Sequence, residues 1–412
     1  VEAQKLKGMG VAEIKEFFDS LKLHCKNVPI APRDYQISSF IHCAKQERAL
    51  LLSPTSSGKS LVIYSLIRWH QQFIENDKIL ILVPTTNLVT QMYNDFKDYS
   101  TKQLNWNVEK ECHMIYSGKE KETEKQIYIS TWQSLFRLGA PYFKKFGMVI
   151  GDEAHLCNAQ SLKGILEKMT TCRYRFGTTG TLTDSKTNKL VLEGLFGSVF
   201  EVTQTKKLIE DNTLAEFGIV AIALQYPDEI RKLNKGKSYQ EEIDWIVGNE
   251  SRNKYIKNLA HSLKGNTLIL FQFVEKHGKV LHPMLKKEGK HIHFIHGGIG
   301  AEEREEVRRL SETNDDNIIL ASYGTFSTGV NIKRLDNIIF ASPSKSKIRN
   351  LQSIGRVLRK SDGNSKATLY DIVDDLQWKQ TKNFATKHFM ERVKIYNEEG
   401  FEYRIYNVNV KG

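Results

Sequence analysis

Short apolar runs alternate with longer amphipathic segments along the first half of the chain. The apolar runs predict strands at 49–52, 78–83, 114–116, 127–130, 148–151 and 173–178. Apolar residues at helical spacing predict helices at 60–72 and 87–99. Strands that alternate with helices of this size are typical of βαβ crossovers. The pattern therefore predicts an α/β domain whose parallel sheet is flanked by helices on both faces.

The same alternation returns after a polar, charge-mixed stretch at about 203–253, which we expect to connect two domains and to hold some local structure. Predicted strands follow at 266–273, 291–296, 317–321, 337–341 and 367–372, with helices at 275–287 and 301–312. The fold class we expect is thus α/β, with two domains built on parallel sheets flanked by helices.

The two ends of the chain add smaller elements. Residues 11–23 carry apolar side chains at helical spacing and predict a short helix that packs on the first domain. The tail predicts a long helix to about Asn397 and then a strand at 402–410. Its many aromatic residues favour packing back on a domain, and a stacking surface for bases is the alternative.

Bulk properties narrow the class of protein. A chain of 412 residues is too long for a single hydrophobic core, so we expect more than one domain. We expect a lead-in at 1–30, a first domain at 31–205, a connection at 206–253, a second domain at 254–375 and a C-terminal extension at 376–412. The net charge of +12 favours a polyanionic partner such as nucleic acid. Five widely spaced cysteines without a CxxC pair indicate reduced thiols and argue against a zinc site. No apolar run approaches the roughly 20 residues that span a bilayer, and no signal peptide is visible.

A glycine-lysine loop and a pair of acids carry the chemistry of the first domain. The sequence LLLSPTSSGKS at 50–60 is an apolar run, a tight loop and a helix start, which together form an anion site. About a hundred residues later, another apolar run ends in Asp152 and Glu153. A phosphate loop paired with adjacent acids indicates hydrolysis of a nucleoside triphosphate.

Each of these residues has an expected role. Lys59 neutralises phosphate charge, Ser60 and Asp152 hold Mg²⁺, and Glu153 orients and deprotonates the attacking water. The loop departs from the usual pattern because Ser53 stands where a glycine is common. A surface acid pair after a core strand is the alternative, and the pairing with the loop argues against it.

The second domain lacks a glycine-lysine loop and offers guanidinium groups instead. Gln352, Arg356 and Arg359 fall at i, i+4 and i+7, on one helix face, where two arginines can stabilise charge on a γ-phosphate. A surface helix with two arginines is the alternative for this spacing taken alone. Residues 323–331 predict a phosphate-contacting loop. Seven Lys or Arg residues and one Asp lie within 345–366, a net charge of +6 that indicates a polyanion-binding face.

These motifs resemble those of superfamily 2 helicases over nearly the whole chain. In family order they are RDYQ (33–36), PTSSGKS (54–60), VPTTNLVTQ (83–91), STWQSL (130–135), DEAH (152–155), TTGT (178–181), LILFQ (268–272), IHGG (295–298), YGTFSTGVN (323–331) and QSIGRVLR (352–359).

The resemblance implies that both domains are RecA-like, and it implies roles for further residues. Nucleotide contacts are implied for Arg33, Gln36, Thr55, Ser57, Gly58, Lys59, Ser60, Gly329 and Asn331, with Gln36 reading both edges of adenine. Coupling of hydrolysis to movement is implied for His155, Thr179 and Thr181. Contacts to the nucleic-acid backbone are implied for Thr85, Thr131, Gln133, His296 and Ser322.

Within the superfamily the second-domain motifs look most like the UvsW-type phage recombination helicases, which remodel branched DNA. Ser56 and Gly151 depart from the commoner residues at their positions, but neither change removes a charge or a ligand. That family carries a small N-terminal DNA-binding domain. Because this chain opens on Val1, we expect a fragment or processed form that begins after such a domain.

We therefore expect an ATP- and Mg²⁺-dependent DNA helicase or translocase that acts on single-stranded and branched DNA. RNA in R-loops is a further candidate partner. The resemblance implies a monomeric motor in the cytoplasm of a phage-infected bacterium. The alternatives are an RNA helicase, a double-stranded DNA translocase that does not separate strands, and a non-catalytic clamp. The clamp predicts loss of the catalytic charges, and all of them are present.

Overall fold

The computed structural model describes residues 11–54, 57–74, 77–116, 118–156, 159–180, 182, 186–203, 216–286, 290–298, 306–307, 309–310, 314, 316–329, 335–342, 366–398 and 400–411. The chain divides into two compact units, Val1–Gln204 and Thr205–Gly412. No helix of the described residues is long and apolar enough to cross a membrane.

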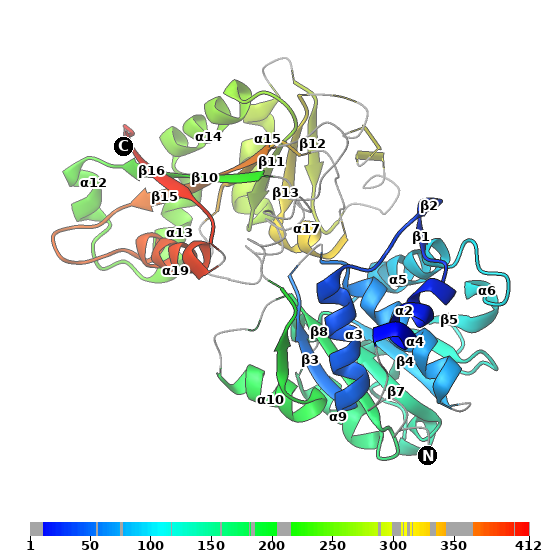
Figure 1. The fold of residues 1–412 in the computed structure, drawn as a ribbon. Helices are drawn as coiled ribbons and strands as arrows, with labels where there is room; N and C mark the ends of the chain where they lie inside the picture. The colour runs from blue at the N-terminus through cyan, green and yellow to red at the C-terminus, as the bar shows by residue number, and fades with distance from the viewer. Residues whose placement is uncertain are drawn as a thin grey trace. The chain divides into compact units, whose positions relative to one another are not determined.

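The first unit is built on a seven-stranded sheet in the order β5-β6-β4-β7-β8-β3-β9, in which every pairing is parallel (Figure 1). Its strands are β3 (Arg48–Leu52), β4 (Lys78–Val83), β5 (Cys112–Ile115), β6 (Ile127–Thr131), β7 (Phe146–Gly151), β8 (Tyr174–Thr179) and β9 (Val199–Glu201). A separate two-stranded antiparallel pair, β1 (His24–Cys25) and β2 (Val28–Pro29), precedes them.

Helices cover both faces of this sheet because its strands are apolar on both sides. Ile79 and Ile81 of β4 belong to one core cluster, whereas Leu80 and Leu82 belong to another. The first cluster lies beneath α2 (Val11–Ser20), α3 (Asp34–Gln46), α4 (Lys59–Phe73), α5 (Thr86–Tyr99) and α6 (Val108–Glu111). The second lies beneath α7 (Trp132–Leu135), α8 (Ala140–Phe143), α9 (Ala159–Lys168) and α10 (Lys186–Phe196). Near-continuous apolar runs are what a doubly covered parallel strand requires.

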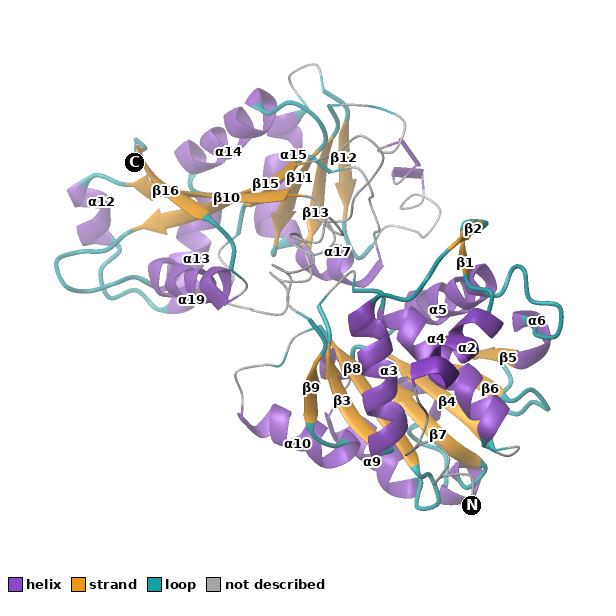
Figure 2. Cartoon of the chain, viewed as in Figure 1, coloured by secondary structure: helices purple, strands orange, loops and turns teal. Residues whose placement is uncertain are grey.

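The second unit repeats the plan with the strand order β12-β13-β11-β14-β15-β10-β16, again parallel throughout (Figure 2). Its strands are β10 (Glu216–Gln225), β11 (Thr267–Phe271), β12 (Ile292–Ile295), β13 (Ile318–Ser322), β14 (Asn337–Phe340), β15 (Lys366–Asp375) and β16 (Tyr403–Asn409). The helices are α12 (Asp228–Leu233), α13 (Tyr239–Gly248), α14 (Glu250–Ser262), α15 (Lys279–Leu285), α17 (Tyr323–Gly329) and α19 (Phe384–Glu398). Two parallel-sheet α/β units confirm the predicted fold class.

Three local expectations need correction. The described part of the expected connection, 206–253, supplies β10, α12 and α13 to the second unit, because β10 pairs along its length with β15. The predicted helix at 275–287 begins as a π turn, Val274–Gly278, before α15. Residues 323–329 form a helix rather than a loop, because Tyr323 and Phe326 are buried three residues apart and Ser322 Oγ accepts a hydrogen bond from the Thr325 N–H.

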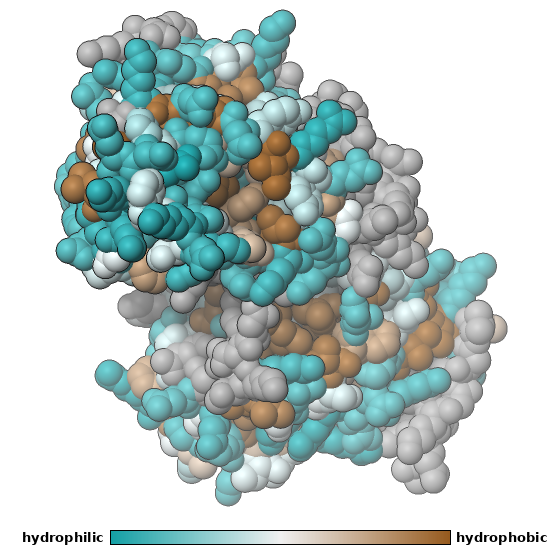
Figure 3. Space-filling view, turned by 90° about the vertical axis from the view of Figure 1, so that its left-hand side faces the viewer, coloured by the Kyte–Doolittle hydropathy of each residue, from teal (hydrophilic) through white to brown (hydrophobic). Residues whose placement is uncertain are grey.

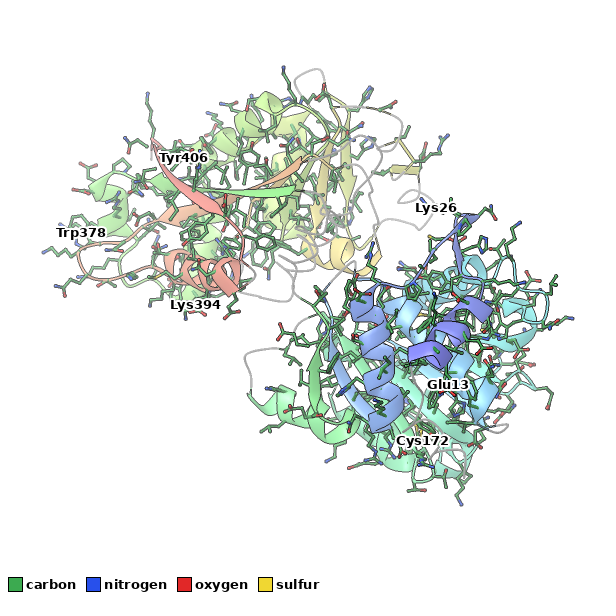
Figure 4. All side chains as sticks on the ribbon, viewed as in Figure 1. Glu13, Lys26, Cys172, Trp378, Lys394 and Tyr406 are labelled. Atoms are coloured by element: carbon green, nitrogen blue, oxygen red, sulfur yellow. The ribbon has the colours of Figure 1, made fainter. Side chains whose placement is uncertain are left out.

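The tail packs back on the second unit. Arg392 of α19 forms a buried ion pair with Asp371 of β15, and β16 lies beside β10 as the edge strand. The outer surface of this region is mostly hydrophilic with a few apolar side chains (Figure 3). Tyr406 of β16 is 49% exposed and Lys394 of α19 also faces solvent (Figure 4). The packing interpretation of the tail therefore holds for the helix and for the main chain of the strand.

Candidate active site

The phosphate loop follows β3 at the carboxyl edge of the first sheet. β3 ends at Leu52, and α4 begins at Lys59 after Gly58, whose φ is +79°. A Cβ at Gly58 would lie 2.3 Å from Gln36 Nε2. The loop therefore needs glycine here both for its left-handed backbone and for the close approach of Gln36. The hydroxyl groups of Ser53 and Ser57 form a hydrogen bond across the loop, with their oxygens 2.6 Å apart.

The RDYQ segment holds this loop from the start of α3. Gln36 Nε2 donates to the carbonyl oxygen of Ser57 at 2.9 Å, while Gln36 Oε1 accepts from the Arg33 N–H at 2.9 Å. Tyr35 donates its hydroxyl to the same Ser57 carbonyl at 3.0 Å, and the Arg33 guanidinium bonds the Tyr35 oxygen. Gln36 is buried, and both ends of its amide are engaged with the protein. The described contacts thus make Gln36 a support of the phosphate loop.

The acid pair follows β7 at the same edge and meets the loop. Lys59 Nζ lies 2.6 Å from Glu153 Oε1, across 94 residues of sequence. Glu153 has a φ of +45°, a strained conformation for a residue with a side chain. Its other oxygen, Oε2, is buried and has no hydrogen-bond partner within the described residues. One carboxylate oxygen therefore neutralises the lysine, and the other remains able to hold a water molecule.

The neighbouring β8 supplies hydroxyl groups to this acid pair. Thr178 donates its hydroxyl to Asp152 Oδ1 at 2.5 Å. His155 Nδ1 lies 2.6 Å from the Thr179 hydroxyl oxygen and 3.6 Å from Glu153 Oε2. The end of β8 thus contacts both ends of the DEAH tetrad.

Burial and neighbouring charges set the protonation of these groups. Burial and then the charge of Glu153 raise the pKa of Asp152. Burial acts to raise the pKa of Glu153 as well, but the charge of Lys59 outweighs it and holds that pKa below its ordinary value. Burial lowers the pKa of His155 to about 4, so the imidazole is neutral at pH 7. The pair therefore divides into an ionised Glu153 and a more basic Asp152.

These residues fit a magnesium nucleotide. Magnesium ions in such sites take one or two protein oxygens and complete their shell with water and substrate phosphates. Asp152 and the Ser60 hydroxyl, which lies 2.8 Å from the Tyr99 hydroxyl, are oxygen donors of this kind. No cluster of three His, Cys, Asp or Glu side chains in the described ranges could hold a metal by itself. The donor set is therefore suited to a cation that arrives with a nucleotide.

The departure at Gly151 has a packing cause. A Cβ there would lie 2.8 Å from the ring of Phe196, the fully buried last residue of α10. The ring of Phe196 fills the space that a larger residue before Asp152 would need. The residue before Asp152 therefore packs against the core of the unit.

The residues expected to contact nucleic acid cluster in each unit. Thr85 caps α5, with its hydroxyl oxygen accepting from the Leu88 N–H, and Gln133 Nε2 donates to the Pro84 carbonyl at 3.1 Å. Thr131 ends β6, which pairs with β4 just before Thr85, and its hydroxyl bonds Ser134. These three predicted contacts therefore share the ends of two adjacent strands.

In the second unit, His296 and Ser322 are likewise at the ends of adjacent strands. β12 ends one residue before His296, β13 ends at Ser322, and the two strands pair. Gly329 ends α17. The other predicted residues, Thr55, Thr181, Asn331, Gln352, Arg356 and Arg359, and the helix expected at 351–360, lie outside the described residues.

Comparison with known proteins places this geometry in a family. Residues 14–184 match the family described as "Type III restriction enzyme, res subunit", and residues 251–361 match "Helicase conserved C-terminal domain". The ATP-dependent DNA helicase uvsW of Enterobacteria phage T4 is 36% identical over 97% of this chain and 81% of its own length. The chain belongs to the UvsW family of superfamily 2 helicases. As a member of this family it is a nucleic-acid-dependent ATPase.

More distant relatives agree with a helicase fold. The DNA 3'-5' translocase XPB2 of Sulfurisphaera tokodaii is 24% identical, with 88% of this chain and 86% of that protein covered. A solved complex of S. cerevisiae dbp5 matches with a TM-score of 0.59 at 13% identity, covering 98% of this chain and 94% of that chain. The structural match supports the two-unit fold of this UvsW-family chain.

Several site residues of this UvsW-family chain escaped the sequence analysis. Thr178 bonds Asp152, Tyr35 bonds the loop, Tyr99 bonds Ser60, and Phe196 packs on Gly151. Tyr35 and Thr178 lie inside matched motifs, so the motif boundaries could have flagged them. Tyr99 and Phe196 carry no local signal, because only the folded chain brings them to the site.

Proposed function

We propose that this chain is an ATP-dependent DNA helicase or translocase that remodels branched DNA by fork regression, Holliday junction branch migration and unwinding of D- and R-loops. Such work serves recombination, repair and replication. The contact of Lys59 with Glu153, at the edge where Asp152 and the phosphate loop meet, is the observation that carries the ATPase part. The similarity to the T4 DNA helicase supports the choice of DNA.

The first unit's residues act on ATP as follows. Lys59 leaves Glu153 for the β- and γ-phosphates, which frees the carboxylate to orient the attacking water and accept its proton. Thr178 and the Glu153 N–H hold Asp152 in place. Magnesium, bound through Asp152 and Ser60, would neutralise the developing phosphate charge. Gln36 keeps the loop in shape while the charges change partners.

The second unit completes the reaction in this proposal. Arg356 and Arg359 stabilise charge on the γ-phosphate, with Gln352 on the same predicted helix face. Gly329 and Asn331 contact the nucleotide. Because these groups come from a different unit than Lys59, ATP binding and hydrolysis would alternately tighten and release them, and movement along DNA would follow.

Coupling and DNA contact use the remaining clusters. His155 senses the γ-phosphate through Glu153 and passes the change to Thr179, with Thr181 following on the same segment. Thr85, Thr131 and Gln133 in one unit, and His296 and Ser322 in the other, contact DNA phosphates. Phosphate contacts carry no sequence preference, as expected for a general motor. We further propose a monomeric motor in the cytoplasm of a phage-infected bacterium.

A substrate panel tests this function. The wild-type chain is incubated with ATP and forked DNA, a Holliday junction, an R-loop or duplex RNA, and the products are resolved on gels. We expect ATP-dependent remodelling of the branched DNA substrates and none with Lys59→Ala. Lys97→Ala is the matched control, because Lys97 lies in the same unit but is exposed, and its ammonium group pairs with the exposed Glu109.

Other outcomes point to the other candidates. Unwinding of duplex RNA without action on branched DNA would identify an RNA helicase. ATPase stimulation by duplex DNA without strand separation would identify a translocase, the activity named for the S. tokodaii relative. ATP hydrolysis by Lys59→Ala at the wild-type rate would overturn the assignment of the site.

A further inference from the structure

The hydroxyl of Ser60 contacts a tyrosine on another helix. Ser60 Oγ lies 2.8 Å from the hydroxyl oxygen of Tyr99, the last residue of α5, across 39 residues of sequence. Tyr99 is buried, with 9% of its surface exposed. The contact therefore joins the first turn of the phosphate-loop helix to the end of α5 under partial exclusion of water.

The ring of Tyr99 has a fixed position. It packs against Tyr64, whose ring centroid lies 5.6 Å away and which follows Ser60 by one turn on the same face of α4. Tyr64 also packs on Phe96 and Trp106 at 5.4 Å, and its hydroxyl accepts hydrogen bonds at 3.0 Å from Arg68 and 2.9 Å from Gln103. An aromatic cluster with its own hydrogen bonds thus holds the phenol oxygen at Ser60.

A serine that ligates a cation gives an oxygen lone pair and keeps one proton. The group that accepts this proton decides where the lone pairs point. The Tyr99 oxygen is placed to accept it, because it lies 2.8 Å from Ser60 Oγ and a phenol oxygen is a hydrogen-bond acceptor. Outer partners of metal ligands commonly act in this way, and their loss lowers metal affinity about 10- to 100-fold.

We propose that Tyr99 is a positioning residue for the magnesium nucleotide: it accepts the Ser60 proton and aims the Ser60 oxygen at the cation. Tyr99 acts on the cation through Ser60. The inference rests on the proposed function, in which Ser60 is a magnesium ligand. It adds a residue from outside every motif of the phosphate site.

The test compares wild type, Tyr99→Phe, Ser60→Ala and the double variant by binding of a fluorescent ADP analogue. Affinity is measured in EDTA and over a magnesium titration. We expect Tyr99→Phe to raise the half-saturating magnesium concentration about 10- to 100-fold. Its affinity in EDTA stays at the wild-type value, because no nucleotide contact is lost. The double variant behaves like Ser60→Ala, because both changes act through one ligand.

Controls separate this role from a structural one. Tyr93→Phe removes another hydroxyl from α5 and should leave the magnesium requirement unchanged. Thermal melting without nucleotide reports any loss of folding, which would lower affinity in EDTA and in magnesium alike. An unchanged or lower magnesium requirement in Tyr99→Phe, with a raised one in Ser60→Ala, would overturn the inference and leave the ATPase assignment standing. Absence of nucleotide binding by the wild-type chain would instead overturn the proposed function and the inference with it.

Discussion

The two units share one architecture but use buried charges differently. In the first unit, the buried charges lie where loops leave the sheet. Glu153 there combines a strained backbone with a carboxylate oxygen that has no hydrogen bond among the described residues and lies 3.6 Å from His155 Nδ1. In the second unit, Arg392 bonds Asp371 through two nitrogens at 2.8 Å, and Tyr396 donates to the same carboxylate. The guanidinium and the carboxylate of this second pair are hydrogen-bonded to each other, and neither residue has a strained backbone. Buried Asp374 of the second unit, paired with Arg252, also has a carboxylate oxygen without a hydrogen bond among the described residues. The strained backbone of Glu153 is therefore the feature that sets the candidate catalytic pair apart.

Glu242 of the second unit is a buried glutamate with surroundings different from those of Glu153. It is 2% exposed, and its carboxylate accepts hydrogen bonds from Asn383 Nδ2 and from the N–H groups of Phe384 and Ala385. All of these donors lie at the start of α19. A glutamate that accepts from an amide side chain and two main-chain N–H groups at a helix start anchors that helix.

Glu153→Gln should produce the largest effect. The loss of the general base should lower kcat for ATP hydrolysis by about 10²- to 10⁴-fold. The free energy of unfolding should fall as well, because Lys59 loses its ion pair. Steady-state ATPase assays with saturating DNA, together with urea unfolding, measure both. Glu242→Gln is the control, and it should cost about 1–3 kcal/mol of stability at an unchanged kcat. Similar kcat losses in the two variants would break the contrast between the units.

Arg392→Met should have the largest effect on stability. It leaves Asp371 buried without its cation, which typically costs about 3–5 kcal/mol. Urea unfolding measures this cost, and Arg392→Met combined with Asp371→Leu should recover most of it, because no lone charge is then left. If the single variant lost ATPase activity while its stability held, the ion pair would belong to the site rather than to the scaffold.

The sequence predicted the strands well for a physical reason. A parallel strand covered on both faces is a continuous apolar run, and β4 occupies Lys78–Val83 as expected. The strand within the expected connection at 206–253 was harder to predict, because β10 (EFGIVAIALQ) follows a polar stretch and its partner β15 is about 150 residues away. Residues 323–329 are rich in glycine and hydroxyl groups, which masked the buried pair of Tyr323 and Phe326.

The candidate site likewise has residues that the sequence predicted and residues that it did not. Motif spacing placed Lys59 and Glu153 after strands of the same domain, and the structure brings their side chains to 2.6 Å across the intervening strand β8. Periodicity carries no information on which side chain of a distant helix will reach a loop. Tyr99 at Ser60 and Phe196 at Gly151 are therefore visible only after packing.

Gly151→Ala should have a moderate effect that the first unit alone explains. The added methyl group meets the ring of Phe196 at 2.8 Å, and overpacking of this kind costs about 1–3 kcal/mol. Because the next residue is Asp152, ATPase activity should fall as well. Gly164→Ala on α9, where nothing lies within 4 Å, is the matched control for urea unfolding and ATPase assays. A stable, fully active Gly151→Ala protein would show that the acid does not depend on this packing.

Substitution of His70 should have the smallest effect on stability at neutral pH. His277 of the second unit is the buried histidine with which it is compared. His70 of α4 is fully buried, and neither ring nitrogen has a hydrogen-bond partner in the described part of the chain. Burial lowers its pKa to about 4. In the second unit, His277 is equally buried, but its nitrogens lie 2.9 Å from the Ser342 hydroxyl and 3.2 Å from Asn253 Oδ1.

A depressed folded-state pKa contributes stability above the unfolded value near 6.5 and loses it as the pH falls toward the folded value. His70 should therefore cost the wild-type protein about 2 kcal/mol between pH 7.5 and pH 5. His70→Leu should remove this acid loss and change little at pH 7.5, since no hydrogen bond is broken. His277→Leu should destabilise at both pH values, because the buried Ser342 hydroxyl and Asn253 Oδ1 each lose a hydrogen bond. Urea unfolding at the two pH values measures all three proteins, and an unchanged acid loss in His70→Leu would assign that loss to other groups, such as His155.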